Sequence, residues 1–261
     1  MTQRKTVILD PGHGGAEPGA IYDGRKEKDD TLRLALAVGR ILERNGVDVL
    51  LTRVRDVYDN PYEKAEIANR SGADFFISIH RNAMPQPNTA SGVETLVFED
   101  SGVRHMLAEN INEALANLTG YTNLGIRERP GLAVLRKTKM PGVLVEAGFI
   151  DNEEDNRIFD EKFEAVASAI AQGILKTIRE EEKAVPEYYQ IQVGAYQDRK
   201  YAEEQENRLK DQGFPAFLVY REPWYQVRVG AFLSMDNAAA MEQKLRQYGY
   251  PTMMVQEQAV Y

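Results

Sequence analysis

The sequence contains no cysteine and only three histidines. Without cysteine the chain can form neither disulfides nor thiolate metal sites, so any transition-metal site must use histidine, aspartate or glutamate. No apolar run approaches the ~20 residues of a membrane-spanning helix. The formal net charge of −8 argues against a general affinity for nucleic acid or for anionic membrane surfaces. These absences indicate a globular protein whose metal chemistry is limited to a few side chains.

The N-terminus lacks the pattern of an export signal. Residues 1–5 lead directly into a strand pattern, Thr6 to Leu9, which leaves no room for the apolar region of a signal peptide. We therefore expect either a protein made without an export signal, and hence cytoplasmic at first, or a chain from which such a signal has been removed. The sequence does not separate the two.

A chain of 261 residues is long enough for about two domains, and its first part alternates strand and helix patterns. Short apolar runs predict strands at residues 6–9, 47–51, 74–79, 93–98, 134–135 and 143–145. Apolar residues at helical spacing predict helices at residues 31–44, 62–70, 105–118 and 163–178. This alternation indicates an α/β fold with a mostly parallel sheet flanked by helices.

The tail contains an internal repeat. Residues 189–196 and 224–232 both end in Val-Gly-Ala and an aromatic residue, and each copy is followed by a helical pattern and a further strand. The repeat predicts a small α+β domain in βαββαβ order, with a four-stranded antiparallel sheet and two helices. A charged segment before it ends in proline and is typical of a linker. We place the first domain at residues 1–182, the linker at 183–187 and the second domain at 188–261.

Polar side chains follow three of the predicted strands: His13, His80 and Glu146. In an open α/β sheet, ligands bind beyond the carboxyl ends of the strands, so parallel neighbours would bring these three groups to one rim. A single histidine at a strand end is more often structural, but three such groups together indicate a metal or catalytic site. The third histidine, His105, starts a predicted helix and is expected at the surface or as a cap.

A catalytic zinc ion keeps three protein ligands and one open position for water. His13 and His80 supply two, and Glu27 is the leading candidate for the third, with Glu17 and Asp29 nearby. Composition alone favours the alternative that Glu27 is an ordinary surface residue near a helix N-terminus.

Glu146 would then be the base that takes a proton from the activated water and passes it to the leaving amine. It directly follows three apolar strand residues. A carboxylate in that position is costly to bury without a partner, and a metal site or its water provides one.

Four motifs resemble the zinc N-acetylmuramoyl-L-alanine amidases. They occur in family order over about residues 5–180, and they are Asp10–Gly15, Glu27, Ser78–Ala83 and Val145–Asn152. The resemblance implies that His13, Glu27 and His80 bind Zn²⁺ and that Glu146 is catalytic, which decides the third ligand. It also implies the substrate, the amide bond between the muramoyl lactyl group and L-Ala of the peptidoglycan stem peptide.

One position departs from the family pattern. Arg81 stands where relatives often carry a small residue, and we expect it on the rim of the site. There it is either solvated or paired with a carboxylate of the stem peptide, since a planar guanidinium suits carboxylates. The adjacent Asn82 is a second candidate for substrate binding.

The tail resembles SPOR domains, which recognise glycan strands that lack stem peptides. The resemblance covers about residues 188–256 and follows the repeated Val-Gly-Ala-aromatic pattern. Exposed aromatic rings and amides on the sheet would suit sugar faces and hydroxyls, although about half of the aromatics are expected in the core. The candidate glycan-binding residues are Gln192, Tyr196, Gln226 and Phe232.

An amidase domain followed by a SPOR domain, without an export signal, is similar to the sporulation amidases that lyse the mother-cell wall. This similarity implies an autolysin whose partner is peptidoglycan, with the stem peptide at the first domain and the glycan strand at the second. Two alternatives remain: a zinc peptidase that cuts within stem peptides, and a wall-binding protein without activity. The second is disfavoured because all four chemical positions are filled.

Overall fold

The computed structural model describes residues 4–184 and 187–258. Its internal contacts divide the chain into two units, Met1–Glu181 and Glu182–Tyr261. Each unit encloses a hydrophobic core of its own. No helix in these described residues is both long and apolar enough to cross a membrane.

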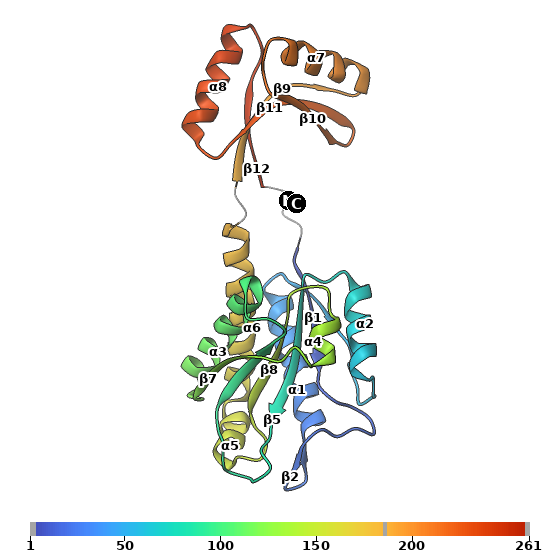
Figure 1. Ribbon diagram of the computed structural model, residues 1–261, viewed down its shortest axis with the longest axis vertical. Helices are drawn as coiled ribbons and strands as arrows, with labels where there is room; N and C mark the ends of the chain where they lie inside the picture. The colour runs from blue at the N-terminus through green and yellow to red at the C-terminus, as the bar shows by residue number, and fades with distance from the viewer. Residues whose placement is uncertain (1–3, 185–186, 259–261) are drawn as a thin grey trace. The chain divides into compact units, whose positions relative to one another are not determined.

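Six strands of the first unit form one sheet in the order β4-β1-β5-β8-β6-β7 (Figure 1). The first four of these are parallel neighbours, whereas β6 runs antiparallel to β8 and β7 runs parallel to β6. This sheet confirms the predicted α/β class. The strands are β1 (Thr6–Pro11), β4 (Asp48–Leu51), β5 (Phe75–Asn82), β6 (Val93–Val97), β7 (Asn123–Glu128) and β8 (Gly142–Phe149).

Helices cover both faces of this sheet, because successive strand side chains point to opposite faces and both sets are apolar. One face packs against α1 (Glu27–Arg44), α3 (Gly102–Thr119), α5 (Glu153–Glu161) and α6 (Phe163–Ala184). The other packs against α2 (Pro61–Ser71) and α4 (Ala133–Lys137), through Ile8, Phe76, Leu96 and Leu144. We call the second the α2/α4 face. By the same alternation, Asp10, His80, Glu94 and Glu146 belong to this face.

Four local features differ from the sequence prediction, one of which is that helix α5 was not predicted. The apolar pair Val134–Leu135 lies in α4 and not in a strand, because two buried apolar residues fit either element and these pack beside α2. Strand β7 was not predicted, since it is a half-exposed edge strand interrupted by Gly125. A short hairpin, β2 (Ile21–Tyr22) and β3 (Arg25–Lys26), was also missed, and it leads directly into α1.

The second unit is the predicted small α+β domain. Its antiparallel sheet has the order β10-β11-β9-β12, and α7 and α8 pack on one face over Ile191, Val193, Val227 and Val229. The elements are β9 (Glu187–Tyr196), α7 (Arg199–Asp211), β10 (Ala216–Arg221), β11 (Trp224–Phe232), α8 (Met235–Gln247) and β12 (Met253–Gln258). We call the face without these helices the open face.

The predicted linker, residues 183–187, overlaps two elements. Its first two residues belong to the end of α6 and its last residue begins β9, while residues 185–186 lie outside the described residues. The linker and the domain limits drawn from it stay a prediction.

Candidate active site

The loop after β1 places the first histidine. The backbone of His13 is left-handed, with φ of 60°, and Gly14 follows with φ of 140°. An added Cβ at Gly12 would lie 2.4 Å from Cε1 of His80, so only glycine allows the two chain segments to approach this closely. Gly12 therefore allows the loop to approach His80, whereas Gly14 and Gly15 allow it to approach the backbone of Val57 and Tyr58.

A buried polar network centred on Asp10 holds the end of β1, from which this loop begins. Asp10, 1% exposed, accepts hydrogen bonds from Ser78 and Thr52 and pairs with Lys64 at 2.9 Å. The Lys64 Nζ also donates to the carbonyl of Pro11, at 2.6 Å. Sequence reasoning did not assign a role to Asp10 or Lys64. The signal was available, since Asp10 is an acid directly after an apolar strand and needs partners if buried.

Glu27 is the first residue of α1 and is held by backbone groups. Its Oε1 accepts the N–H of Arg81 and its Oε2 accepts the N–H of Ala20, both at 3.0 Å. Gly19, with φ of 68°, packs against this carboxylate, since an added Cβ would lie 2.6 Å from Oε2. The hairpin before α1 thus folds the chain back and fixes the carboxylate at the β1 and β5 ends.

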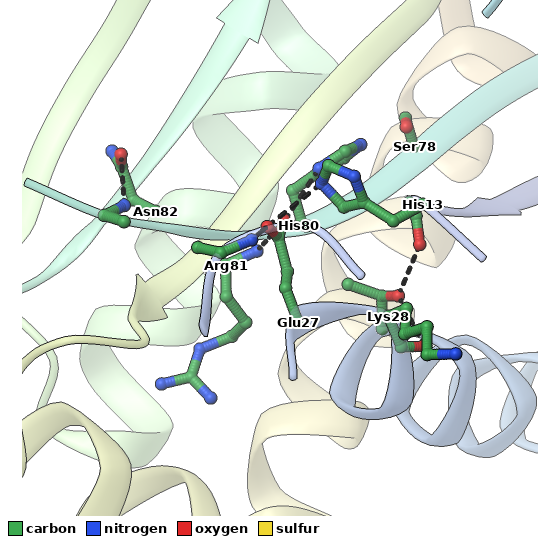
Figure 2. Close-up of polar contacts among 12 residues, drawn as sticks. His13, Glu27, Lys28, Ser78, His80, Arg81 and Asn82 are labelled. Atoms are coloured by element: carbon green, nitrogen blue, oxygen red, sulfur yellow. Dashed lines mark hydrogen bonds and ion pairs between the residues drawn. The ribbon is translucent and has the colours of Figure 1, made fainter. Parts of the chain in front are cut away.

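Two imidazoles converge on the Glu27 carboxylate (Figure 2). His13 Nε2 lies 3.0 Å from Oε2, and His80 Nδ1 lies 2.9 Å from Oε1. On its other side, His13 Nδ1 contacts the carboxylate of Glu17, which fixes the ring orientation. Burial acts to raise the pKa of Glu27, but hydrogen bonds with the two histidines outweigh it and hold that pKa well below its usual range.

These three residues form a group that could hold a metal ion. One ligand atom from each of His13, Glu27 and His80 lies within 4.8 Å of the other two. Two imidazole nitrogens and one carboxylate oxygen are a donor set that zinc uses in catalytic sites with a fourth position open. The donor chemistry therefore fits the metal that the resemblance implied. The alternative Glu17 lies behind His13, and Asp29 is exposed on α1.

Glu146 lies on β8 directly beside His80 of β5, on the same face of the sheet. Both residues lie within their strands, which run further than the sequence indicated. The Oε2 atom of Glu146 is buried and has no hydrogen-bond partner among the described residues. Burial, reinforced by the charges of Glu27 and Glu94 and opposed by His80, raises the pKa of Glu146 to about 7. A carboxyl with this pKa can accept and return a proton near neutral pH.

The expected position of Arg81 on the rim is wrong. Its side chain is fully buried and points away from the two imidazoles (Figure 2). The guanidinium pairs with Asp30 at 2.8 Å, donates to Asn156 at 2.8 Å and stacks 4.2 Å above the ring of Phe159. These partners satisfy the buried charge and leave no path to a substrate carboxylate. Arg81 therefore joins α1 and α5 to the end of β5.

Asn82, the second candidate for substrate binding, is half-buried at the end of β5. Its Nδ2 donates to Oε1 of Glu94 at 2.7 Å, and its Oδ1 accepts the N–H of Ala83. Its amide is thus already oriented by the protein, and a role toward substrate stays a prediction. His105 is half-exposed and pairs with Asp100, as expected for a surface histidine.

Only two of the four glycan-binding candidates belong to the open face. Gln192 and Gln226 lie there beside Arg228, in register with the residues of neighbouring strands. Tyr196 and Phe232 instead pack against the core on the helix side, and Tyr196 Oη donates to Gln205 of α7 at 2.6 Å. The prediction that these two aromatics bind glycan is therefore corrected.

A cavity of about 330 Å³ adjoins the histidines on the α2/α4 face. Apolar groups from the loop before α2 and from α4 form much of its wall, and the acids Glu17 and Asp59 lie at its border. Its other lining residues are Asp10, His13, Tyr58, Pro61, Lys64, His80, Leu132, Ala133, Val134 and Leu144. The candidate metal group thus opens onto a concave surface large enough for part of a substrate.

The fold and the site together place a candidate metal centre, with a buried carboxyl beside it, at the strand ends of an α/β sheet. The family model of N-acetylmuramoyl-L-alanine amidase (Amidase_3) matches residues 7–176, and the SPOR domain model matches residues 185–256. The chain belongs to the N-acetylmuramoyl-L-alanine amidase family and carries a C-terminal SPOR domain. This confirms the resemblance in both parts and makes the protein a peptidoglycan amidase of the cell wall.

Similar proteins are found both by sequence and by structure. The sporulation-specific N-acetylmuramoyl-L-alanine amidase of Bacillus subtilis (strain 168) is 31% identical over 221 residues, which cover 83% of this chain and 85% of that protein. The amidase CwlM of Bacillus licheniformis is 32% identical over the same shares. The crystal structure of an N-acetylmuramoyl-L-alanine amidase from Clostridium difficile 630 has a TM-score of 0.64 at 32% identity and covers 68% of this chain and 98% of that one.

Proposed function

We propose that this amidase is zinc-dependent, that His13, Glu27 and His80 hold the ion, and that Glu146 is its general base and acid. The observation that carries the proposal is the convergence of the three ligand atoms within 4.8 Å, beside a buried Glu146 oxygen that has no hydrogen-bond partner in the described part of the chain. A bound Zn²⁺ would supply Lewis acidity and lower the pKa of water toward ~7.

The protein's own groups then move the protons. With its pKa raised to about 7 by burial, the Glu146 carboxylate accepts a proton from the attacking water. The remaining hydroxide adds to the lactyl carbonyl carbon, the bond from that carbon to the L-Ala nitrogen breaks, and Glu146 returns the proton to that nitrogen. The products are a muramoyl carboxylate and a stem peptide with a free amino end.

We place glycan binding on the open face of the SPOR domain. Arg228 lies at its centre, 3% exposed, and its guanidinium is held by Gln226 at 2.6 Å, Glu257 at 2.7 Å and Gln190 at 2.9 Å. Burial acts to raise the pKa of Glu257, but its hydrogen bond with Arg228 outweighs this and lowers that pKa. The result is a fixed polar surface whose amides, including Gln192, suit sugar hydroxyls.

We further infer a role in lysis of the mother-cell wall during sporulation. The support is the B. subtilis relative, which is named sporulation-specific and matches this chain across both domains. Deletion of the gene in the native host is expected to leave mature spores enclosed in mother-cell walls. Normal spore release in the deletion strain would argue against this role but would leave the chemistry untouched.

The chemistry is tested by metal content and digestion products together. The purified chain is expected to hold about one zinc per molecule and to release intact stem peptides that begin with L-Ala from purified wall. Chelation should abolish release, and added zinc should restore it. Cleavage inside the stem peptide would indicate a peptidase, and full activity in zinc-free protein would refute the metal assignment.

A further inference from the structure

A row of polar residues crosses the α2/α4 face from the metal site to the edge of the sheet. His80 of β5 and Glu94 of β6 each lie directly opposite Glu146 of β8. Arg127 of the edge strand β7 is in register with Leu96, whose side chain packs on this same face. The side chain of Arg127 therefore also belongs to the α2/α4 face.

Arg127 is anchored by a buried acid and yet open to solvent. Glu94 is 6% exposed, and its Oε1 accepts a hydrogen bond from Asn82. Its Oε2 forms an ion pair with Arg127 Nε at 2.7 Å and accepts no aligned hydrogen bond among the described residues. The Arg127 side chain remains 51% exposed. Within the described residues, Nη1 and Nη2 donate no hydrogen bond, and the side chain's one ion-pair partner is Glu94. A guanidinium fixed at Nε presents these two nitrogens as a fork that matches a carboxylate.

The cavity lies on the other side of the metal site from Arg127, and it is apolar and acidic where the Arg127 side is basic. There the cavity is walled by Tyr58, Leu132 and Val134 and bordered by the acids Glu17 and Asp59. Its basic residue Lys64 is already paired with Asp10. A carboxylate would be repelled on this side, whereas an uncharged sugar ring with apolar faces is compatible with it.

These two sides give the bound substrate a direction. The scissile amide joins an uncharged muramoyl group to a peptide that carries at least a terminal carboxylate. One strand separates β7 from β8, which is about 10 Å at two strand spacings, and Arg127 is level with Leu144, two residues before Glu146 on β8. An extended peptide covers about 10 Å in about three residues. The anchored guanidinium is thus within reach of a carboxylate in the first three residues of the stem peptide.

We propose that Arg127, oriented by Glu94, binds a carboxylate of the stem peptide, so that the peptide runs from the metal site toward β7 and the muramoyl sugar lies toward α2 and α4. The proposal builds on the proposed cleavage of the lactyl amide. The sequence had indicated Arg81 for this carboxylate contact, but the side chain of Arg81 is buried. The proposal assigns the contact to Arg127. Arg127 is a specificity residue and takes no part in the proton transfers.

The test uses the full zinc-loaded chain and two soluble muramoyl tripeptides, one with free carboxylates and one with every carboxylate converted to an amide. Arg127→Ala is expected to raise KM for the first substrate on the order of tenfold to a hundredfold, with kcat little changed, and to leave the second unaffected. Arg127→Lys should recover part of the loss, since it keeps the charge without the fork. Arg70→Ala, which removes an exposed arginine paired with Glu66 on α2, is the matched control.

Product binding gives a second measurement that does not depend on cleavage. The free tripeptide is titrated calorimetrically into wild type and Arg127→Ala, and the variant is expected to bind it about tenfold or more weakly. Equal losses with both substrates, or unchanged KM and unchanged product affinity, would overturn the proposal. Failure of the wild type to cut either tripeptide at the lactyl amide would count against the proposed function instead, and the titration would still decide the role of Arg127.

Discussion

The two proposed binding regions of this chain are both centred on a buried charge, but the charge is fixed in different ways. Glu27 is 4% exposed, and each of its oxygens accepts a backbone N–H. Arg228 is 3% exposed and is held by three side chains, Gln190, Gln226 and Glu257. A group fixed by the backbone keeps one geometry, whereas a group fixed by side chains can rearrange. We therefore expect severe effects at the metal site and graded effects on the open face.

The largest effect is expected at Glu146. Glu146→Gln keeps the size of the side chain but removes its ability to accept a proton, so kcat should fall by about 10²- to 10⁴-fold. The three metal ligands do not include Glu146, so the zinc content should stay the same. Release of stem peptide and metal analysis on the same samples would check both statements. Loss of zinc from Glu146→Gln would show that Glu146 helps to hold the ion and would contradict its assignment as the base alone.

The next largest effect concerns the residue behind His13. Glu17→Gln removes the carboxylate that orients the ring, and the affinity for zinc should fall about 10- to 100-fold. Competition with a chelator measures this affinity, and excess zinc should restore most of the activity. Asp29→Asn is the control, because Asp29 is an exposed acid on the nearby helix. Equal zinc affinity in wild type and Glu17→Gln would show that the backbone alone fixes the site.

A smaller effect is expected on the open face. Gln226→Ala removes one amide that faces solvent and holds Arg228, and binding to glycan strands without stem peptides should weaken about 2- to 10-fold. Turnover of a soluble muramoyl peptide should not change. Tyr196→Phe is the matched control, since its hydroxyl contacts Gln205 on the helix side. A loss of glycan binding in Tyr196→Phe, with none in Gln226→Ala, would show that glycan binds on the helix side of the sheet and not on the open face.

The sequence predicted the convergence of the candidate metal ligands better than it predicted their surroundings. His13, His80 and Glu146 could be placed because parallel neighbouring strands bring their ends together. Glu27 could not be chosen over its neighbours from composition, because its position depends on a hairpin of two-residue strands that leaves no periodic signal. The contribution of that hairpin became visible only through the backbone hydrogen bonds to the carboxylate.

The wrong assignments have a common physical cause, the alternation of side chains along a strand. Arg81 follows His80 within β5, which continues to Asn82, so the two side chains point to opposite faces. In β9 a register shift occurs between Gln192 and Tyr196, and in β11 another occurs before Phe232. Each shift moves the aromatic residue from the open face to the core. Strand ends and bulges are the features that a single sequence specifies least.

The smallest effect should appear in the pH dependence of the metal site. The charge of Glu94 acts to raise the pKa of Glu146, which is about 7. Glu146 must be deprotonated to act as the base, so kcat/KM falls as the pH drops through this pKa. Glu94→Gln removes the negative charge, favours the ionised form of Glu146, and should move the acidic limb to lower pH. The measurement uses a substrate with amidated carboxylates, so that a change in carboxylate binding by Arg127 does not affect kcat/KM.

The matched control for this shift is Glu99→Gln, which removes an exposed acid just after β6 and should leave the limb in place. A limb that moved to higher pH in Glu94→Gln would mean that the buried charge acts on another group. A limb that did not move would mean that the bound metal alone sets the protonation of the site. In that case the contrast between the two regions would depend on the ion and not on how the surrounding chain fixes each charge.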